Sequence, residues 1–238
     1  MSASTNAPAC HAMPTKANFD RECRMLQRLL TILGMYSREL GIDTDSGDAG
    51  LLEWLTAATL FGTRIGSTIA CDAFRLLKAH SITVATAPDT PWEEIVHLLD
   101  DAHYVRYDFR TATRLQAIGL MLREKYSGRL PALLRNAETP EEGVALLDGL
   151  PGWGPVTVRI FLRELRGRLH CADIPYDNRA AWMADHLGLS QRSGQYLHAY
   201  AEQLGWDVRD LEARLVRGAL AHRLVRNCPG GDACVVLP

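Results

Sequence analysis

The stretch LPGWGPVTVRIF, residues 150–161, decides how this chain folds, because two prolines and two glycines stand between positions 151 and 155. Glycine permits backbone conformations that other residues resist, and proline is tolerated in the first turn of a helix. A tight turn between two helices is therefore predicted. The backbone N–H groups of Gly152, Gly154 and Val156 would gather where the second helix starts, a place that favours a phosphate. The alternative is a helix–helix connection that binds nothing.

Apolar residues recur with helical spacing on both sides of this turn. One stripe runs through Leu26, Leu29, Leu30 and Leu33, and the same spacing resumes directly after the turn. Residues 90–93 and 139–142 both read Thr-Pro-x-Glu, a capping box that starts a helix. The segment ITVATA, 82–87, is too short to carry a sheet. These signals predict an all-α fold of about ten helices.

Two helical lobes are expected. A helical barrel over residues 45–167 ends with the tight turn, and a discontinuous second lobe combines residues 19–44 with residues 168–238. Residues 1–18 are small, polar and unpatterned, so they are expected to form a flexible tail. The chain has no apolar run of about 18 residues and no signal-peptide core at its N-terminus. No membrane association is expected, and the default location is the cytoplasm, or the nucleoid if the protein is bacterial.

Overall charge says little about partners, because the formal net charge of the 238 residues is −2. A nucleic-acid interpretation must therefore rest on local charge. Arg159, Arg163 and Arg166 recur at i, i+4 and i+7 after the turn, and a basic stripe beside a phosphate-ready turn suits a nucleic-acid backbone. The alternative for such a stripe is a solvated helix face.

The quoted stretch resembles the helix-hairpin-helix of endonuclease III-like DNA glycosylases, the HhH-GPD superfamily, which has the pattern L-P-G-x-G-x-x-T-A. A second element, DNRAAWMADHLG at 177–188, resembles the family's aspartate-led helix, and LLEWLTAATLFGTRIG at 51–66 looks like its first barrel helices. Loosely, the resemblance covers residues 25–234. It implies that the hairpin, with Gly152, Gly154, Val156 and Arg159, binds the phosphate backbone of double-stranded DNA beside a damaged or mismatched base.

The resemblance also implies that Asp177 is the catalytic aspartate of a base-excision repair enzyme. Such an enzyme flips the base out of the stack and hydrolyses its N-glycosidic bond. A carboxylate stabilises the positive charge that develops on the sugar and orients or deprotonates the attacking water. The alternatives are that Asp177 only caps the following helix, or that Asp173 is the reacting carboxylate.

Val156 marks a departure from the family. Members that also cleave the DNA strand keep a lysine there, which attacks the sugar and forms a Schiff base. The only lysines of this chain are Lys16, Lys78 and Lys125, far from the hairpin in sequence. A monofunctional glycosylase is therefore predicted, with AP-lyase activity weak or absent.

The C-terminal cysteines mark another departure. Many members hold an iron–sulfur cluster on C-x6-C-x2-C-x5-C, and here only Cys228 and Cys234 keep the spacing of the last two ligands. We interpret them as a degenerate remnant and expect no metal or cofactor, because a cluster needs four protein ligands. A zinc site of His222 with both cysteines is the alternative, and it lacks a fourth ligand. No role is assigned to His186.

Three residues are candidates for the base pocket or for intercalation: Phe61, Arg64 and Tyr107. The resemblance implies that Phe61 and Arg64 stand in the loop that, in the family, fills the gap left by the flipped base, although Phe61 could equally be a core residue. Tyr107 could stack on a base, and Arg110 could meet a phosphate. Burial in the barrel is favoured for Tyr104.

The function predicted from these observations is a monomeric DNA N-glycosylase. The main alternative is a non-catalytic helix-hairpin-helix protein that binds DNA, and a third is a protein-interaction domain without DNA. Oxidised pyrimidines, mismatched uracil or thymine, and adenine opposite oxidised guanine all remain open as substrates, because pocket shape decides among them.

Overall fold

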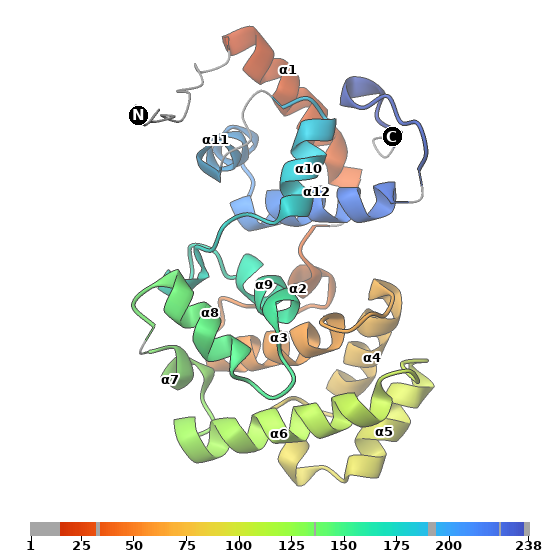
Figure 1. The fold of residues 1–238 in the computed structure, drawn as a ribbon, viewed down its shortest axis with the longest axis vertical. Helices are drawn as coiled ribbons and strands as arrows, with labels where there is room; N and C mark the ends of the chain where they lie inside the picture. Colours follow the sequence, from red (N-terminus) through yellow and green to blue (C-terminus); the bar gives the residue numbers. More distant parts are fainter. Residues whose placement is uncertain (1–14, 32–33, 136, 190–193, 224, 236–238) are drawn as a thin grey trace, which may run out of the picture. The chain divides into compact units, whose positions relative to one another are not determined.

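The computed structural model describes residues 15–31, 34–135, 137–189, 194–223 and 225–235, and no strand occurs among them. The all-α prediction is confirmed. The chain divides into two compact units, a larger one of Leu33–Asp177 and a smaller one of Met1–Ile32 with Asn178–Pro238 (Figure 1). Residues 33–44 and 168–177, expected in the second lobe, thus group with the larger unit. None of the described helices is long and apolar enough to cross a membrane.

The larger unit contains eight of the described α-helices and two short 3-10 turns. They are α2 (Tyr36–Glu39), α3 (Asp48–Phe61), α4 (Ser67–Ala79), η2 (Ala87–Asp89), α5 (Trp92–Asp101), α6 (Asp108–Tyr126), α7 (Leu130–Leu134), α8 (Pro140–Asp148), α9 (Pro155–Arg163) and η3 (His170–Ala172).

One of the two predicted capping boxes forms. Thr139 accepts a hydrogen bond from the backbone N–H of Glu142, whose carboxylate accepts one from the backbone N–H of Thr139, at the start of α8. At the start of α5 the N-cap is Pro91 and no side chain caps the helix. The Thr90 hydroxyl donates instead to the carbonyl of Thr86, so it closes the preceding 3-10 turn. The capping box predicted at residues 90–93 is therefore wrong, although the helix that it predicts does form.

Helix α3 lies at the centre of the larger unit, where it packs against α4 and α9 (Figure 1). Trp54 on α3 is fully buried, and its indole N–H donates to the carbonyl of Phe161 at 3.0 Å. The buried indole of Trp153, in the hairpin, donates to the Thr59 hydroxyl at 3.1 Å. Burial of such aromatic side chains contributes about 1.5–3 kcal/mol each, so the hairpin is firmly attached to the core.

The smaller unit contains α1 (Lys16–Gln27), η1 (Arg28–Thr31), α10 (Asn178–His186), α11 (Gly194–Leu204), α12 (Val208–His222) and η4 (Gly231–Ala233). Helix α12 packs on α10 and α11, and α1 packs on α11.

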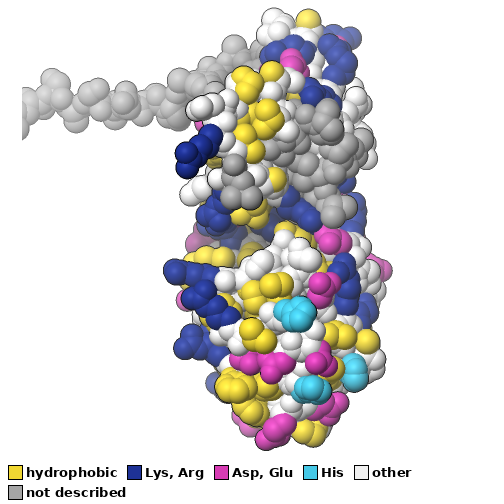
Figure 2. All heavy atoms as spheres, turned by 90° about the vertical axis from the view of Figure 1, so that its right-hand side faces the viewer, with side chains coloured by type: hydrophobic (Ala, Val, Ile, Leu, Met, Phe, Trp, Pro, Cys, Tyr) yellow, Lys and Arg dark blue, Asp and Glu magenta, His cyan; other side chains and the backbone are white. Residues whose placement is uncertain are grey.

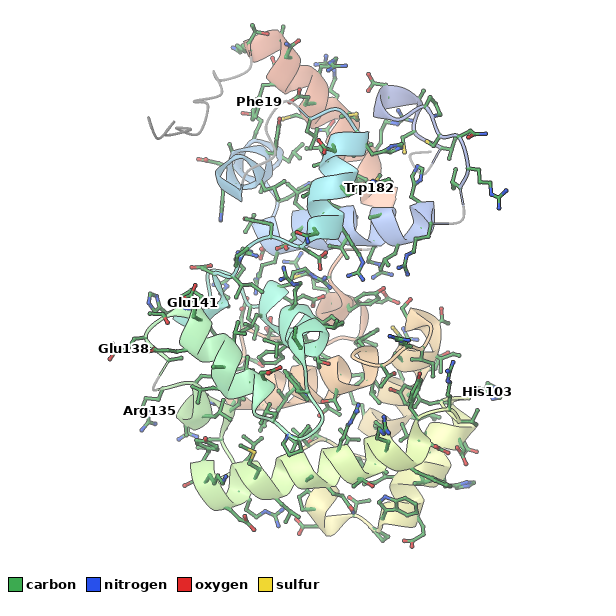
Figure 3. All side chains as sticks on the ribbon, viewed as in Figure 1. Phe19, His103, Arg135, Glu138, Glu141 and Trp182 are labelled. Carbon is green, nitrogen blue, oxygen red and sulfur yellow. The ribbon has the colours of Figure 1, made fainter. Side chains whose placement is uncertain are left out.

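One aromatic contact and one hydrogen bond to a buried carboxylate join α1 to α11. The Phe19 ring (Figure 3) stacks on the Tyr200 ring with their centroids 4.9 Å apart, and the Tyr200 hydroxyl donates to the buried Glu22 carboxylate. Helix α1 begins at Lys16, within the expected tail of residues 1–18, and residues 1–14 lie outside the described part of the chain.

Candidate nucleic-acid interface

The hairpin forms a tight turn between α8 and α9. The Trp153 N–H donates to the carbonyl of Leu150 at 3.0 Å, and Gly152 has a φ of +73°, a conformation that favours glycine. None of Gly152, Gly154 and Val156 donates its backbone N–H to another described residue. Val156 is 58% exposed at the start of α9. The turn therefore presents three N–H groups at a helix N-terminus, where an anion is favoured.

Two hollows in the larger unit share Arg110 and Arg114 of α6, and the first of them is lined in part by Pro151 and Gly152 of the turn. The first has a volume of about 420 Å³ and the second about 290 Å³. The first is lined by Phe109, Arg110, Thr113, Arg114, Ala117, Pro151 and Gly152, and the second by Gly62, Thr63, Arg64, Tyr107, Arg110 and Arg114. We call these lining residues together the arginine groove.

The arginine groove concentrates positive charge. It contains three arginines, and no acidic residue is among the described residues that line it. Burial, followed by the positive charge of Arg110, lowers the pKa of Arg114. Such a repulsion between cations is relieved by an anion. Figure 2 shows one face of the molecule, on which Lys and Arg side chains gather in groups beside acidic and hydrophobic ones, consistent with local basic surfaces on a chain of net charge −2.

The candidates for the base pocket have different surroundings. Arg64 is exposed and Tyr107 half-buried, and both line the groove. The half-buried ring of Phe61 packs against Tyr36 and Trp54, with centroid distances of 4.5 and 6.4 Å, which favours the core alternative over a wedge. Tyr104 is fully buried, as predicted, and its hydroxyl donates to the carbonyl of Leu60. Among the arginines of the groove, the one that sequence reasoning missed is Arg114, which lies one helical turn after Arg110.

Two of the three arginines of the basic stripe, Arg163 and Arg166, lie neither on a solvated face nor on a face open to DNA, and the expectation is corrected for these two, whereas Arg159 is half-buried. Arg163 and Arg166 are only 4% and 5% exposed, and α9 ends at Arg163. Arg166 donates to the carbonyl of Ile174 at 2.7 Å and stacks on the Tyr176 ring.

Arg159, expected to bind phosphate, donates to the carbonyl of Pro175 at 3.2 Å. The Arg163 guanidinium lies 3.8 Å from the Asp177 carboxylate. All three arginines therefore hold one segment, residues 174–177, and we call them the arginine clamp.

Asp177 stands at the end of the clamped segment and directly before α10. It is 4% exposed and pairs with Arg163, so its carboxylate is held in one place by a buried cation. The alternative carboxylate, Asp173, is exposed and accepts a hydrogen bond from the backbone N–H of Gly167 at 3.2 Å. Asp173 thus closes the turn that precedes the segment, which favours Asp177 as the reacting group.

The two cysteines of the expected cluster remnant have histidine neighbours in the smaller unit. Cys228 and Cys234 lie with His222 and His186, and one potential ligand atom of each residue is within 4.8 Å of the others. His186, at the end of α10, is thus a candidate for the fourth ligand that sequence reasoning found missing. Six-residue spacing of His222, Cys228 and Cys234 was a visible signal, whereas His186 is 42 positions from Cys228.

No family model matches the sequence, and a search of curated proteins found no match. Among solved structures, the chain is similar to endonuclease III trapped as a covalent intermediate with DNA, in an estranged-adenine complex. The TM-score is 0.51 at 17% sequence identity, and the likeness covers 94% of this chain and 97% of that one. At this identity the likeness shows the fold, so the chain has the fold of endonuclease III.

Proposed function

We propose that this protein is a DNA glycosylase that hydrolyses the N-glycosidic bond of a damaged or mismatched base in double-stranded DNA. The observation that carries the proposal is the arginine clamp, which joins the second helix of the hairpin to the segment ending at Asp177. A hairpin suited to phosphate and a carboxylate suited to sugar chemistry are thereby coupled within one unit. The shared fold with a DNA-bound endonuclease III supports this interpretation.

DNA is held through its phosphates in this proposal. The N–H groups of Gly152, Gly154 and Val156 point the partial positive charge of a helix N-terminus at one phosphate. Arg110 and Arg114 in the arginine groove bind neighbouring phosphates, and their charge is uncompensated among the groove's lining residues. Tyr107 and Arg64 are positioned in the same groove to contact a base or its neighbour.

Asp177 is the catalytic residue of the proposed reaction. The bond between C1′ and the base nitrogen breaks, and its electron pair leaves with the base, which takes a proton from solvent. The negative carboxylate stabilises the cationic sugar, and a water oxygen then bonds to C1′ as its proton passes to Asp177. Arg163 positions the carboxylate and stays charged throughout, so it contributes no proton.

Strand cleavage through a Schiff base needs an amine near the sugar, and the hairpin offers no lysine for this step. The side chain at the relevant position is the exposed, apolar Val156, and Lys78 pairs with Glu53 at 2.8 Å on other elements. We therefore expect no covalent adduct when wild-type protein and DNA are mixed with borohydride. An adduct in good yield would contradict the monofunctional mechanism.

The decisive experiment measures base release from duplexes that carry oxidised pyrimidines, mismatched uracil or thymine, or adenine opposite oxidised guanine. Asp177→Asn should lower the single-turnover rate by about 10²–10⁴-fold, because the amide can neither accept a proton from the attacking water nor stabilise the cationic sugar with a negative charge. Asp173→Asn is the matched control, since that carboxylate is exposed and closes a turn, and its rate should stay within a few-fold of wild type.

A specific observation favours one rival, a DNA-binding protein without catalysis. Asp177 is buried and paired with Arg163, an arrangement that a purely structural carboxylate would also show. The rival predicts salt-dependent DNA binding with no base release from any duplex of the panel. Equal release by wild type and Asp177→Asn would instead reject Asp177 as the catalytic residue.

A further inference from the structure

The four-residue cluster in the smaller unit is arranged like a ligand set. His186 and His222 are the last residues of α10 and α12, and Cys228 and Cys234 flank the short turn η4. The Nε2 atom of His186 lies 3.3 Å from the Sγ atom of Cys228. The two imidazole rings are 4.3 Å apart and steeply inclined to each other. Four ligand atoms from three separate segments therefore converge on one point.

The loop that carries the cysteines is shaped to reach His186. Gly230 has a φ of +74°, and a Cβ atom there would lie 2.4 Å from the carbonyl oxygen of His186. Glycine is thus needed for the backbone to pack directly on the end of α10. Within the loop, the backbone N–H of Val235 donates to the Cys228 sulfur at 3.4 Å. The loop therefore brings the thiol close to His186, and this hydrogen bond orients it.

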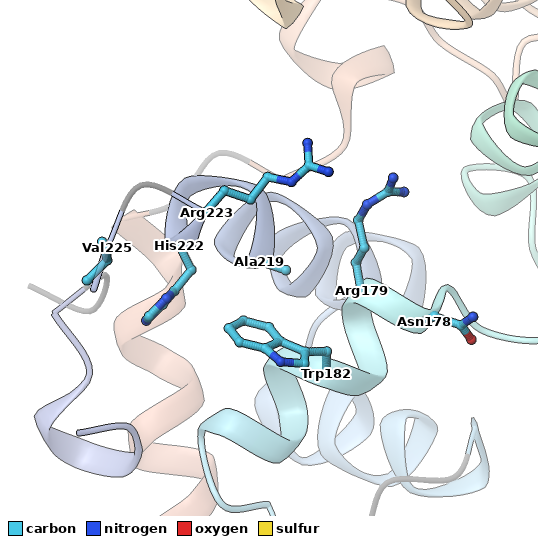
Figure 4. Close-up of a pocket in the computed structure, with 7 residues that line it drawn as sticks. All are labelled: Asn178, Arg179, Trp182, Ala219, His222, Arg223 and Val225. Carbon is cyan, nitrogen blue, oxygen red and sulfur yellow. The ribbon is translucent and has the colours of Figure 1, made fainter. Parts of the chain in front are cut away.

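Trp182 orients the histidines. Its ring stacks on the His186 ring with the centroids 5.1 Å apart, and it meets the His222 ring in a T-shaped arrangement with the centroids 5.4 Å apart. Figure 4 shows Trp182 beside His222, where both line a hollow of about 380 Å³. These ring contacts restrict how the two imidazoles can turn.

The cluster contains a polar atom that the protein itself does not satisfy. His222 is 7% exposed, and its Nε2 atom is buried without a hydrogen-bond partner among the described residues. Buried nitrogens of this kind are destabilising unless something binds them. Neither Cys228 nor Cys234 forms a disulfide with another described residue, and Cys234 is buried. A bound cation would satisfy the imidazole nitrogen and use both sulfurs.

We propose that His186, His222, Cys228 and Cys234 bind a single zinc ion as a tetrahedral Cys₂His₂ site. Zinc bonds of about 2.3 Å to sulfur and about 2.0–2.1 Å to nitrogen place tetrahedral ligand atoms roughly 3.3–3.8 Å apart. The observed separations, up to 4.8 Å, need only small side-chain shifts to meet these values. Structural zinc sites use four protein ligands of these types.

The same residues do not fit an iron–sulfur cluster. A four-iron cluster takes four thiolates, and this cluster contains two. A two-iron cluster with two histidines would put the cysteines and histidines on different irons, which separates them. The 3.3 Å distance between His186 Nε2 and Cys228 Sγ places a cysteine and a histidine together instead.

Zinc here would join the C-terminal ends of α10 and α12 to the loop of residues 228–235. The smaller unit would thus gain a crosslink among three segments that otherwise meet through side-chain packing. This inference does not depend on the proposed glycosylase activity, because it rests on ligands within the smaller unit alone.

The first test is metal content. Full-length protein purified from zinc-supplemented cells without a metal-affinity tag should contain about one zinc per chain and no stoichiometric iron by mass spectrometry. His222→Ala and Cys234→Ser should each lose most of the zinc. Two matched controls should keep it: His198→Ala changes an exposed histidine of the same unit, and Cys23→Ser changes a buried cysteine of α1.

A second measurement on the wild-type chain guards against variants that fail to fold. Zinc is removed with a chelator and replaced by cobalt(II), which should bind one per chain and give the visible bands of a tetrahedral site with thiolate charge-transfer bands. Zinc should then displace the cobalt. Absence of both zinc and cobalt binding at micromolar concentrations would overturn the proposal. So would iron with inorganic sulfide in stoichiometric amount, or full zinc retention by both ligand variants.

Discussion

Arg163 is the residue on which the candidate active site depends most. Its side chain is buried against Asp177, whereas the exposed Arg168 pairs with Asp45 at 3.2 Å in solvent. The buried pair matters more, because water screens the exposed one. A planar guanidinium also fixes a carboxylate in a way that an ammonium does not. Arg163 is therefore expected to position Asp177 without touching DNA.

Arg163→Lys should lower the single-turnover rate of base release roughly 10- to 100-fold, because a small displacement of a reacting group has effects of this size. The dissociation constant for DNA should change little, since Arg163 is buried. Arg168→Lys is the control and should match wild type in both measurements. A fall in DNA affinity with an unchanged rate would assign Arg163 to binding.

Glu164 offers a second test at this scale, through pH. Its carboxylate is fully buried and accepts hydrogen bonds from the backbone N–H groups of Tyr36 and Ser37, both at 2.9 Å. Burial raises its pKa above the ordinary value of 4.5, although Arg163 and these hydrogen bonds oppose the rise. The folded state therefore binds the proton more tightly than the unfolded state does.

A raised pKa in the folded state gives stability that is complete below about pH 4.5 and is lost as the pH rises through the raised value. Wild type should consequently lose stability relative to Glu164→Gln as the pH is raised, because glutamine does not titrate. Denaturant unfolding of both proteins at several pH values measures this difference. A difference that stays constant, or grows in favour of wild type, would contradict the burial argument.

At the scale of elements, the hairpin separates two glycines that look alike in the sequence. Gly152 has a φ of +73°, and a Cβ atom there would lie 2.2 Å from Nε of Arg114. Gly154 has an extended φ of −162°, and an added Cβ atom would meet nothing within 4 Å.

Gly152→Ala should lower the free energy of unfolding by about 1–2 kcal/mol, the penalty for a left-handed conformation. Gly154→Ala, its matched control, should leave stability close to wild type. If a DNA backbone approaches this turn, Gly154→Ala should still weaken DNA binding. Equal stability of the two variants in chemical denaturation would contradict the left-handed conformation of Gly152.

The arginine groove is formed by α6 and by the two loops beside it, and it makes a prediction about salt. Arg110→Ala and Arg114→Ala should each weaken binding to duplex DNA. Each should also reduce the slope of log K against log salt by about 0.9, the value for one phosphate contact. Fluorescence anisotropy at several salt concentrations measures both effects.

Arg123→Ala is the control for that experiment, because Arg123 is on the same helix and hydrogen-bonds to Asp89 at 2.6 Å. Its removal changes the net charge by the same amount without touching the groove. If all three substitutions weaken DNA binding equally, the binding depends on the total charge of the protein. That result would contradict DNA binding by the arginine groove.

At the scale of the whole molecule, two compact units mean that one unit can be perturbed while the other keeps its structure. Removal of zinc by a chelator should speed hydrogen exchange near His186, His222 and the loop 228–235. It should leave α3 and α9 of the larger unit protected, since their core contains none of the ligands.

Hydrogen-exchange mass spectrometry of the full chain, with and without chelator, provides the measurement. Saturating zinc at about a thousand times its dissociation constant should raise the melting temperature of the smaller unit by about 15–30 °C. Exchange that increases equally in both units, or in neither, would contradict a local crosslink.

The sequence by itself determined the helical fold, the hairpin and the start of α8, because these depend on signals between residues close in the chain. Glycine and proline restrict the backbone where they stand, and Thr139 reaches Glu142 within one turn of helix. Helical periodicity likewise records which side of a helix is apolar. It does not record what a polar side chain on that helix will meet.

Tertiary structure alone decided the two features on which the two proposals rest. Arg163 and Arg166 have the spacing of a solvated stripe, yet residues 174–177 fold back over them and bury them. His186 meets Cys228 from 42 positions away, so no local pattern identifies it as a ligand. Contacts between residues so far apart are set by how helices pack, and packing depends on the whole chain at once.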